Sequence, residues 1–191
     1  MKLLLHSCCA PCSNACVEWL RDEILHGAFN APPDFSLFWY NPNIHPLTEY
    51  NARMESLVSF ADGAGLELLT QNEYGLRDFL KAVNNSGNPE PIWDVPARCA
   101  LCYRIRLEKT ARLALEKGFS AFSTTLLASP YQKHDLIRQT GEECARETGV
   151  DFFYWDFRPR FHEGQKKARE SGSYMQKYCG CIFSEEERYL A

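Results

Sequence analysis

Cysteine is the residue type in this chain whose number and spacing most clearly indicate chemistry. Seven of the nine cysteines fall into three short groups, which are Cys8, Cys9 and Cys12, then Cys99 and Cys102, then Cys179 and Cys181. Grouped thiolates select soft metals, namely zinc, copper(I) or iron–sulfur clusters. Because a four-coordinate site uses four cysteines, seven grouped thiols predict two metal centres.

The spacing within the first two groups fits metal ligands. Cys8 and Cys9 are adjacent, so their side chains diverge and we expect them to serve two neighbouring metals. Cys12 lies one helical turn further on, near an expected helix N-terminus that favours the thiolate form. Cys99 and Cys102 are three residues apart and share one face of a helical turn.

The last group and the remaining cysteines complete the pattern. In Cys179-Gly180-Cys181 the glycine relieves crowding between two thiols. Cys16 and Cys144 are isolated within expected helices, and we interpret both as small buried hydrophobes. Three chemistries compete for the grouped thiols: structural zinc, a vicinal disulfide between the first two cysteines, and a cubane iron–sulfur cluster. The surplus over one zinc site favours the cluster.

Bulk composition predicts a globular protein of one domain. The chain has 191 residues, with 45% hydrophobic and 24% charged residues, which is enough to bury a core without disulfides. Its first residues hold too short an apolar run for a secretory signal, and no apolar stretch is long enough to span a membrane. We therefore expect a cytoplasmic protein with reduced thiols and no membrane partner.

Charge is divided unevenly along the chain. The formal net charge is −4, yet residues 1–97 carry five Lys/Arg against twelve Asp/Glu, and residues 98–191 carry sixteen against thirteen. The stretch Arg158–Lys177 holds six basic and two acidic residues. Such a local basic surface is compatible with docking of a polyanion. A solvated helix face is the alternative interpretation.

Short apolar runs alternate with amphipathic stretches and predict an α/β fold. Strands are expected at Lys2–His6, Phe35–Tyr40, Glu67–Thr70, Ala121–Thr125 and Phe152–Trp155. Helices are expected from Pro11 to Gly27, over Tyr50–Ala61, and over Cys99–Lys117 and Asp135–Glu147. This order favours a mostly parallel sheet flanked by helices, with ligands beyond the carboxyl ends of the strands. The first thiol group follows a strand at that edge. Asn84–Ala97, with three prolines, is expected to be an exposed loop.

Five motifs follow one another along nearly the whole chain. They are Leu5–Cys12 (LHSCCAPC), Tyr40–Pro46 (YNPNIHP), Arg98–Tyr103 (RCALCY), Thr124–Leu126 with Ser129–Tyr131, and Tyr178–Cys181 (YCGC). Together they closely resemble the QueH-type epoxyqueuosine reductases. The resemblance implies an enzyme that reduces the epoxide of epoxyqueuosine at the wobble position of tRNA to give queuosine. It also implies a HUP-like fold, similar to the adenine nucleotide alpha hydrolases.

The same resemblance implies the cofactors and their ligands. A [4Fe-4S] cluster is expected on Cys9, Cys102, Cys179 and Cys181. A second metal, expected to be iron, would be held by Cys8 and Cys99, by a cluster sulfide and by a third protein ligand. Some relatives supply an aspartate as this ligand, and the candidate here is Cys12.

Two other functions compete with this interpretation. An ATP-dependent tRNA thiolase can share the fold and also use a cluster. The segment Ser7–Cys12 after the first strand contains no glycine, however, so it lacks the phosphate-binding loop and ATP is not expected. A non-catalytic, zinc-stabilised RNA-binding module is the alternative outside the enzymes.

Reduction of the epoxide requires two electrons, two protons and release of the oxygen as water. An external donor would supply the electrons, and a nearby side chain a proton. The candidates for the proton donor are His45, in the loop after the second strand, then His6 and Tyr178. Candidate walls for the wobble base are Trp39, Tyr40, Trp93, Tyr103 and Tyr131, and candidate phosphate contacts are Arg98, Arg158, Arg160, Lys166, Lys167 and Lys177.

Overall fold

A parallel five-stranded sheet forms the centre of the protein. The computed structural model describes residues 1–26, 33–87 and 94–190. Within these residues the strands are β1 (Lys2–His6), β2 (Asp34–Trp39), β3 (Leu68–Thr70), β4 (Ala121–Thr124) and β5 (Asp151–Phe152). They lie in the order β3-β2-β1-β4-β5, and every neighbouring pair is parallel. The order reverses beside β1, which makes the sheet doubly wound.

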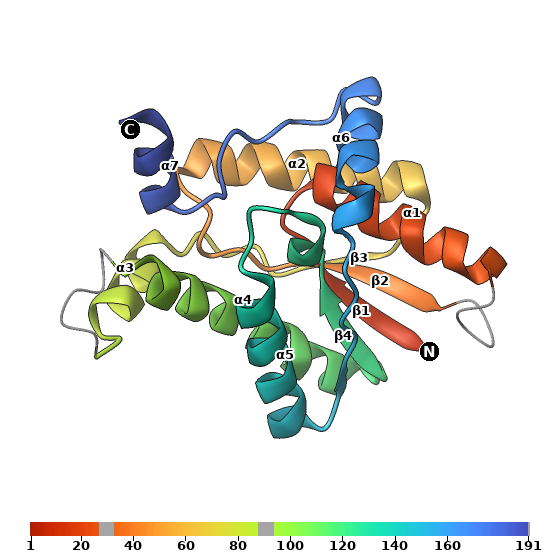
Figure 1. Cartoon of the computed structure of the whole chain (residues 1–191), viewed down its shortest axis with the longest axis horizontal. Helices are drawn as coiled ribbons and strands as arrows, with labels where there is room; N and C mark the ends of the chain where they lie inside the picture. The colour runs from red at the N-terminus through yellow and green to blue at the C-terminus, as the bar shows by residue number, and fades with distance from the viewer. Residues whose placement is uncertain (27–32, 88–93, 191) are drawn as a thin grey trace.

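Helices cover both faces of the sheet. They are α1 (Ala10–His26), α2 (Leu47–Ala64), α3 (Leu76–Asn84), α4 (Val95–Lys117), α5 (His134–Thr148), α6 (Phe161–Glu170) and α7 (Ile182–Tyr189), with short 3-10 turns η1 (Thr125–Ala128) and η2 (Arg158–Arg160). Figure 1 shows α1, α2 and α6 on one side of the sheet and α4 and α5 on the other. None of the described helices is long and apolar enough to cross a membrane.

The expected α/β class is confirmed, and so are four of the strands within one or two residues. The fifth strand was placed wrongly. It was expected at Phe152–Trp155, but only Asp151 and Phe152 pair with β4. Trp155 instead lies against Trp19 of α1, with ring centroids 4.4 Å apart. The later aromatic residues of this run thus pack on a helix, and only Phe152 belongs to the sheet.

The region expected as an exposed loop, Asn84–Ala97, is shorter in the structure. Asn84 is the last residue of α3, and α4 begins at Val95. The Asp94 carboxylate caps α4 by accepting a hydrogen bond from the backbone N–H of Ala97 at 2.9 Å. Proline is tolerated in the first turn of a helix, so Pro96 marks a helix start. Residues 88–93 of this loop lie outside the described residues.

Strand β1 is the centre of the core and sets the position of the first thiols. Leu3, Leu4 and Leu5 are fully buried, as expected for a central parallel strand covered on both faces. At its end the His6 ring links β1 to its two neighbours. Its Nδ1 lies 2.9 Å from Thr124 Oγ1 at the end of β4, and its Nε2 lies 3.2 Å from the carbonyl oxygen of Tyr40 just after β2. These hydrogen bonds hold the start of the thiol segment in place.

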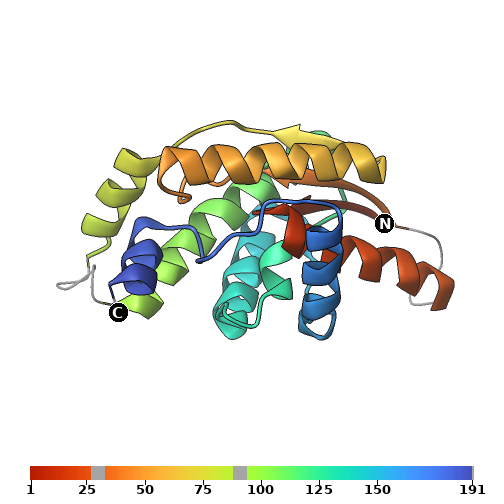
Figure 2. The same cartoon turned by 90° about the horizontal axis from the view of Figure 1, so that it is seen from above.

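The C-terminal part of the chain reaches the same edge of the sheet. Helix α6 packs closely on α1 at Gly164. A Cβ at this position would lie only 2.7 Å from the Ala15 Cβ, so only glycine allows the two helices to approach this closely. After α6, residues 171–181 pass the N-terminal end of α1 on the way to α7 (Figure 1, Figure 2). This connection carries the last two grouped cysteines to the first three.

Candidate metal centre

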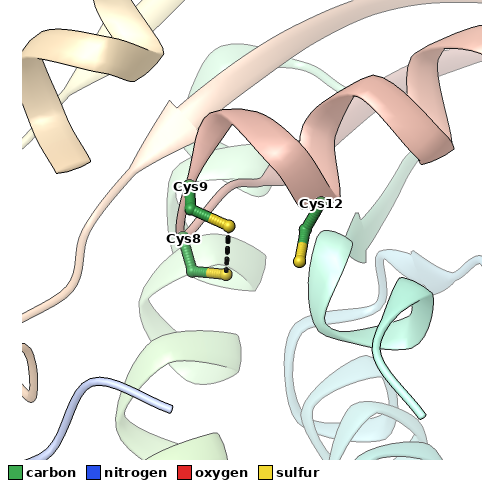
Figure 3. Close-up of side chains that lie close together, drawn as sticks. All are labelled: Cys8, Cys9 and Cys12. Carbon is green, nitrogen blue, oxygen red and sulfur yellow. Dashed lines mark hydrogen bonds between the residues drawn. The ribbon is translucent and has the colours of Figure 1, made fainter. Parts of the chain in front are cut away.

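The first thiol group lies between the ends of β1 and β4. Cys8, Cys9 and Cys12 are buried, and their sulfur atoms lie within 4.8 Å of one another (Figure 3). The backbone N–H of Cys8 donates to Thr125 Oγ1 at 3.4 Å, just beyond β4. All nine cysteines are free, and the Cys8 and Cys9 sulfurs are 3.8 Å apart. A vicinal disulfide is therefore absent, and the trio can hold a metal ion.

The three thiols share their protons unequally. Hydrogen bonds from Cys12 and Cys9 lower the pKa of Cys8. Burial raises the pKa of Cys9, and the hydrogen bond to Cys8 raises that of Cys12. Cys8 is thus the thiol of the trio that loses its proton most readily. A metal ion has to displace the protons that remain on the trio, so its binding at this group is expected to release protons.

Four further thiols line a second cavity, of about 160 Å³. They are Cys99, Cys102, Cys179 and Cys181. The first two lie on one face of α4, as their spacing predicts. Gly180 has a φ of 131°, a conformation that L side chains rarely adopt, and this lets the chain turn between the last two thiols.

Arg53 of α2 holds the segment before α7 in place. Its guanidinium donates to the carbonyl oxygens of Tyr178 at 2.9 Å and Cys179 at 3.0 Å. Its Nε also forms an ion pair with Glu49 at 2.7 Å, and both side chains are buried. A fixed, charge-assisted contact therefore fastens the third thiol group to the body of the protein.

A larger cavity, of about 660 Å³, joins the two thiol groups. Cys8, Cys12 and Cys179 lie in its wall. Tyr131, Gln132 and Cys179 line both cavities, so the two spaces adjoin. No Asp or Glu is among the described residues in the wall of the larger one. The three groups that are far apart in sequence thus meet at one place.

Polar side chains that the sequence analysis did not identify donate hydrogen bonds to these sulfurs. Gln176 Nε2 lies 2.9 Å from Cys9 Sγ, and Gln132 Nε2 lies 3.3 Å from Cys179 Sγ. The guanidinium Nη2 of Arg106 lies 3.1 Å from Cys102 Sγ. Hydrogen bonds to ligand sulfurs tune a metal centre. Only Arg106, four residues after Cys102 on a helix, carried a recognisable spacing signal.

The three candidate proton donors occupy different places. His45 and His6 are fully buried, and neither is among the described residues that line the two cavities. The His45 ring lies against Tyr74 and Phe79, and its Nε2 is 3.1 Å from the carbonyl oxygen of Pro42. Tyr178 does line the larger cavity, and its hydroxyl donates to the carbonyl oxygen of His45 at 2.6 Å.

Acid is expected to destabilise the protein through His45. Burial lowers the pKa of His45 from 6.5 to about 4. Between these values the unfolded chain binds a proton and the folded chain does not, so the free energy of unfolding falls as the pH drops from 6.5 towards 4. The loss of stability is about 1–3 kcal/mol. Above pH 6.5 the imidazole is neutral in both states, so His45 causes no loss there.

Denaturant unfolding of the wild type and of His45→Gln at pH 7 and pH 4.5 measures this contribution. The difference between the two proteins cancels titrations that both share. We expect the variant to lose less stability on acidification than the wild type. Equal losses would show that His45 takes up no proton on unfolding.

The basic stretch Arg158–Lys177 divides into paired and unpaired cations. Arg158 pairs with Asp156, Arg160 with Asp22 and Glu163, Lys166 with Glu170, and Lys167 with Glu18 and Glu163. Arg169 and Lys177 form no ion pair within the described residues, and both line the larger cavity together with Arg188 of α7. Arg98, also a candidate phosphate contact, pairs with Glu187.

The candidate aromatic residues for the base-binding wall fall into core residues and residues at the cavities. Trp39 is fully buried and donates to the Tyr50 hydroxyl, so it belongs to the core. Tyr103 is buried as well but faces the smaller cavity, and Tyr40 is partly buried. Tyr131 is 84% exposed at the boundary of the two cavities. Trp93 lies outside the described residues.

Comparison with known proteins gives a consistent result. The family model described as "Epoxyqueuosine reductase QueH" matches residues 3–187. Proteins named epoxyqueuosine reductase QueH are 37% identical in Dehalococcoides mccartyi, over 98% of this chain and 94% of the relative, and 35% identical in Thermotoga maritima, over 97% and 91%. The Histophilus somni protein of that name is 35% identical over 96% of this chain and 72% of its own length.

Proposed function

The chain belongs to the epoxyqueuosine reductase QueH family, and we propose that it reduces the epoxide of epoxyqueuosine in tRNA to give queuosine. It is accordingly an oxidoreductase of tRNA modification. The observation that carries this proposal is the meeting of three distant thiol segments at two adjoining cavities, whose walls hold six of the seven grouped free cysteines. Because tRNA is modified in the cytoplasm, we expect the protein there, with an external protein or small molecule as electron donor.

The donor set supports a [4Fe-4S] cluster with a second metal ion beside it. The thiols that hold a cubane are separated by the cluster itself, so they lie farther apart than the ligands of one ion. Thiols that come from separate segments and meet at the smaller cavity suit that wider arrangement. The Cys8 and Cys9 sulfurs, 3.8 Å apart, lie close enough for the first segment to serve both centres. When bound, the two centres would supply single electrons and Lewis acidity.

The division of ligands between the two centres has two forms. The family resemblance places the cluster on Cys9 with Cys102, Cys179 and Cys181, and the second metal, proposed as iron, on Cys8, Cys99 and Cys12. The cavity geometry instead groups Cys99 with the other cluster thiols. We propose the first division and give below the pair of variants that separates it from the second.

The position of the site supports a HUP-like, adenine nucleotide alpha hydrolase-like fold. In doubly wound parallel sheets, ligands bind where the strand order reverses, beyond the carboxyl ends of the strands. Here the order reverses between β1 and β4. Cys8 lies at that point, hydrogen-bonded to Thr125. A thiol-rich segment thus occupies the place where such sheets bind their ligands.

The chain's own residues would bind and orient the substrate in the larger cavity. The side chains of Gln165 and Gln176 line it, and the buried Gln176 Oε1 has no hydrogen-bond partner within the described residues, so it can accept from a substrate hydroxyl. Tyr178 is the one proton-donor candidate in its wall. Its hydroxyl carries a proton at neutral pH, as an unperturbed phenol does, and to reach the substrate it would exchange its present hydrogen bond to the carbonyl oxygen of His45. We propose Tyr178 for that role ahead of His45 and His6.

We also propose that the unpaired cations of this cavity contact the phosphates of the anticodon loop. Arg169, Lys177 and Arg188 come from α6, the connection after it, and α7, and all three are exposed. Tyr131 offers an exposed ring beside them on which a base can stack. Unstacked loop bases are the part of RNA that proteins commonly bind in this way.

Substitution of a single unpaired cation is expected to weaken tRNA binding and its salt dependence. Each of Arg169→Gln, Lys177→Gln and Arg188→Gln should reduce the slope of log K against log salt concentration by about 0.7, the contribution of one phosphate contact on a single strand. Filter binding or fluorescence anisotropy across salt concentrations gives the slope.

The control is Arg158→Gln, from the same basic stretch. Arg158 is already paired with Asp156 by two hydrogen bonds, so we expect little change in its slope. If Arg158→Gln flattened the salt dependence as much as Arg169→Gln, the assignment of the phosphate contacts to the cavity would be wrong.

The function itself is tested with tRNA that carries epoxyqueuosine. Anaerobically reconstituted protein and a chemical reductant should convert the modified nucleoside to one lighter by a single oxygen atom, as seen by mass spectrometry of the digested tRNA. No ATP should be needed. Protein that carries the cluster and the second metal but leaves the nucleoside unchanged would contradict the proposal.

A further inference from the structure

Arg106 of α4 is a buried cation without a carboxylate partner among the described residues. It is only 2% exposed, and no ion pair to Asp or Glu is formed by it in that part of the chain. Its Nε donates to the carbonyl oxygen of Cys102, and its Nη2 lies 3.1 Å from Cys102 Sγ. The other fully buried arginine, Arg53, is by contrast neutralised by Glu49 at 2.7 Å.

A buried charge without a counter-charge is costly. Removing an ion from water costs several kcal/mol unless an opposite charge compensates. The groups around Arg106 that can carry negative charge are thiols, because it lines the smaller cavity together with Cys99, Cys102, Cys179 and Cys181. They become thiolates when they bind a metal. The guanidinium itself stays charged, because arginine is not deprotonated in proteins.

The placement of Arg106 follows from the helix. It lies seven residues after Cys99 and four after Cys102, on the same face of α4. Tyr103 packs against it, with the guanidinium 5.7 Å from the ring centroid. One short segment thus carries two thiols and the positive charge that faces them.

We propose that Arg106 is a positioning residue that supplies the counter-charge of the thiolate-bound metal centre and thereby raises its reduction potential. This inference rests on the proposed function. Reduction adds a negative charge to the centre, and a cation nearby stabilises the reduced form more than the oxidised one. Net charge and hydrogen bonds to ligand sulfurs are both known to set the potentials of iron–sulfur clusters.

Three variants of the full-length, reconstituted protein separate charge from packing. Arg106→Gln removes the charge and keeps a polar side chain, whereas Arg106→Lys keeps the charge. Arg104→Gln is the matched control, because Arg104 lies on the same helix, is 31% exposed and pairs with Glu108 and Glu147. Iron and sulfide content are measured first, and then the midpoint potential is determined by a dye-mediated titration followed in the visible spectrum.

We expect Arg106→Gln to shift the midpoint to a more negative potential, and Arg106→Lys and Arg104→Gln to remain near the wild type. If the glutamine variant fails to take up iron while the lysine variant loads normally, that result also supports a charge role. A glutamine variant with the wild-type potential would overturn the inference. A lysine variant that shifts or fails as much as the glutamine variant would overturn it too, because the effect would then be one of packing.

A failure of the proposed function gives a different result. If the wild type takes up no iron and sulfide, the reductase proposal fails, and the charge inference is then measured with Co²⁺. Binding of a divalent ion to four thiols that lose their protons makes the site more negative, so Arg106 should favour the bound state. Arg106→Gln should then bind Co²⁺ more weakly than Arg106→Lys, as followed by the thiolate-to-cobalt absorption. Equal affinities would overturn the inference.

Discussion

Replacement of Cys102 by serine is expected to remove the iron–sulfur cluster and to lower turnover of epoxyqueuosine in tRNA by more than about 100-fold. Loss of residues that only support a metal ligand costs about 10- to 100-fold, and Cys102 is itself a proposed ligand. It is 7% exposed, lines the smaller cavity and accepts a hydrogen bond from Arg106. A serine hydroxyl at this place is neutral and binds iron poorly. Iron and sulfide content and single-turnover kinetics measure the effect.

Cys144→Ser is the matched control for this variant. Cys144 is also fully buried and free, but it lies on α5 and lines neither thiol cavity within the described residues. Its substitution should cost about 1–3 kcal/mol of stability, the penalty for a buried hydroxyl, and leave iron content unchanged. Equal iron loss in both variants would mean that the cluster responds to general destabilisation and not to its ligands.

A pair of variants decides how the thiols are divided between the two centres. If the family resemblance assigns them correctly, Cys9→Ser loses the cluster and Cys99→Ser loses only the additional metal ion. If the grouping within the smaller cavity governs, the two results are exchanged. Total iron and labile sulfide in each variant distinguish the outcomes, because only loss of the cluster removes the sulfide.

The second large effect is expected at Arg53. Arg53→Met should destabilise the protein by about 3–5 kcal/mol, because it leaves the buried carboxylate of Glu49 without its partner. It also frees the carbonyl oxygens of Tyr178 and Cys179, so the third thiol group should lose its fixed position and cluster loading should fall. Denaturant unfolding and iron content after reconstitution give the two numbers.

The double variant Arg53→Met/Glu49→Gln separates the two roles of this side chain. Removing the unpaired carboxylate should restore part of the stability, although Glu49 also accepts a hydrogen bond from Tyr174. Cluster loading should stay low, because the contacts to the segment before α7 are still missing. Restoration of both stability and loading would contradict the assigned positioning role.

Most of the elements that carry the first two thiol groups could be predicted from the sequence. Lys2–His6 forms a strand within the same bounds, and α1, α2, α4 and α5 cover the expected helical segments. These segments are long or strongly apolar, so local pattern and tertiary packing agree. The position of Cys8 at the carboxyl end of β1 followed from the same rule.

The C-terminal part was less predictable, for physical reasons. Helices α6 and α7 are only 10 and 8 residues long and polar, so their period is weakly marked. The close packing of Gly164 on Ala15 brings α6 to α1, and no local pattern shows a contact between segments so far apart. For the same reason the sequence did not separate Arg158, which is paired, from Arg169, which lines the cavity.

The hydrogen-bond donors to the sulfurs lay beyond sequence reasoning as well. Gln176 and Gln132 are ordinary polar residues in connecting segments, and their roles arise only where those segments pass Cys9 and Cys179. His45 shows the opposite case. Its motif and loop position favoured a proton donor, but tertiary packing places its ring between Tyr74 and Phe79.

The most direct test of the central claim is analysis of iron, labile sulfide and zinc in anaerobically purified wild-type protein, together with its visible spectrum. The seven grouped thiols predict about four or five irons and four sulfides per chain, with broad thiolate-to-iron absorption. A fifth iron would identify the second centre. Zinc without sulfide would contradict the reductive function and leave a zinc-stabilised RNA-binding protein as the better account.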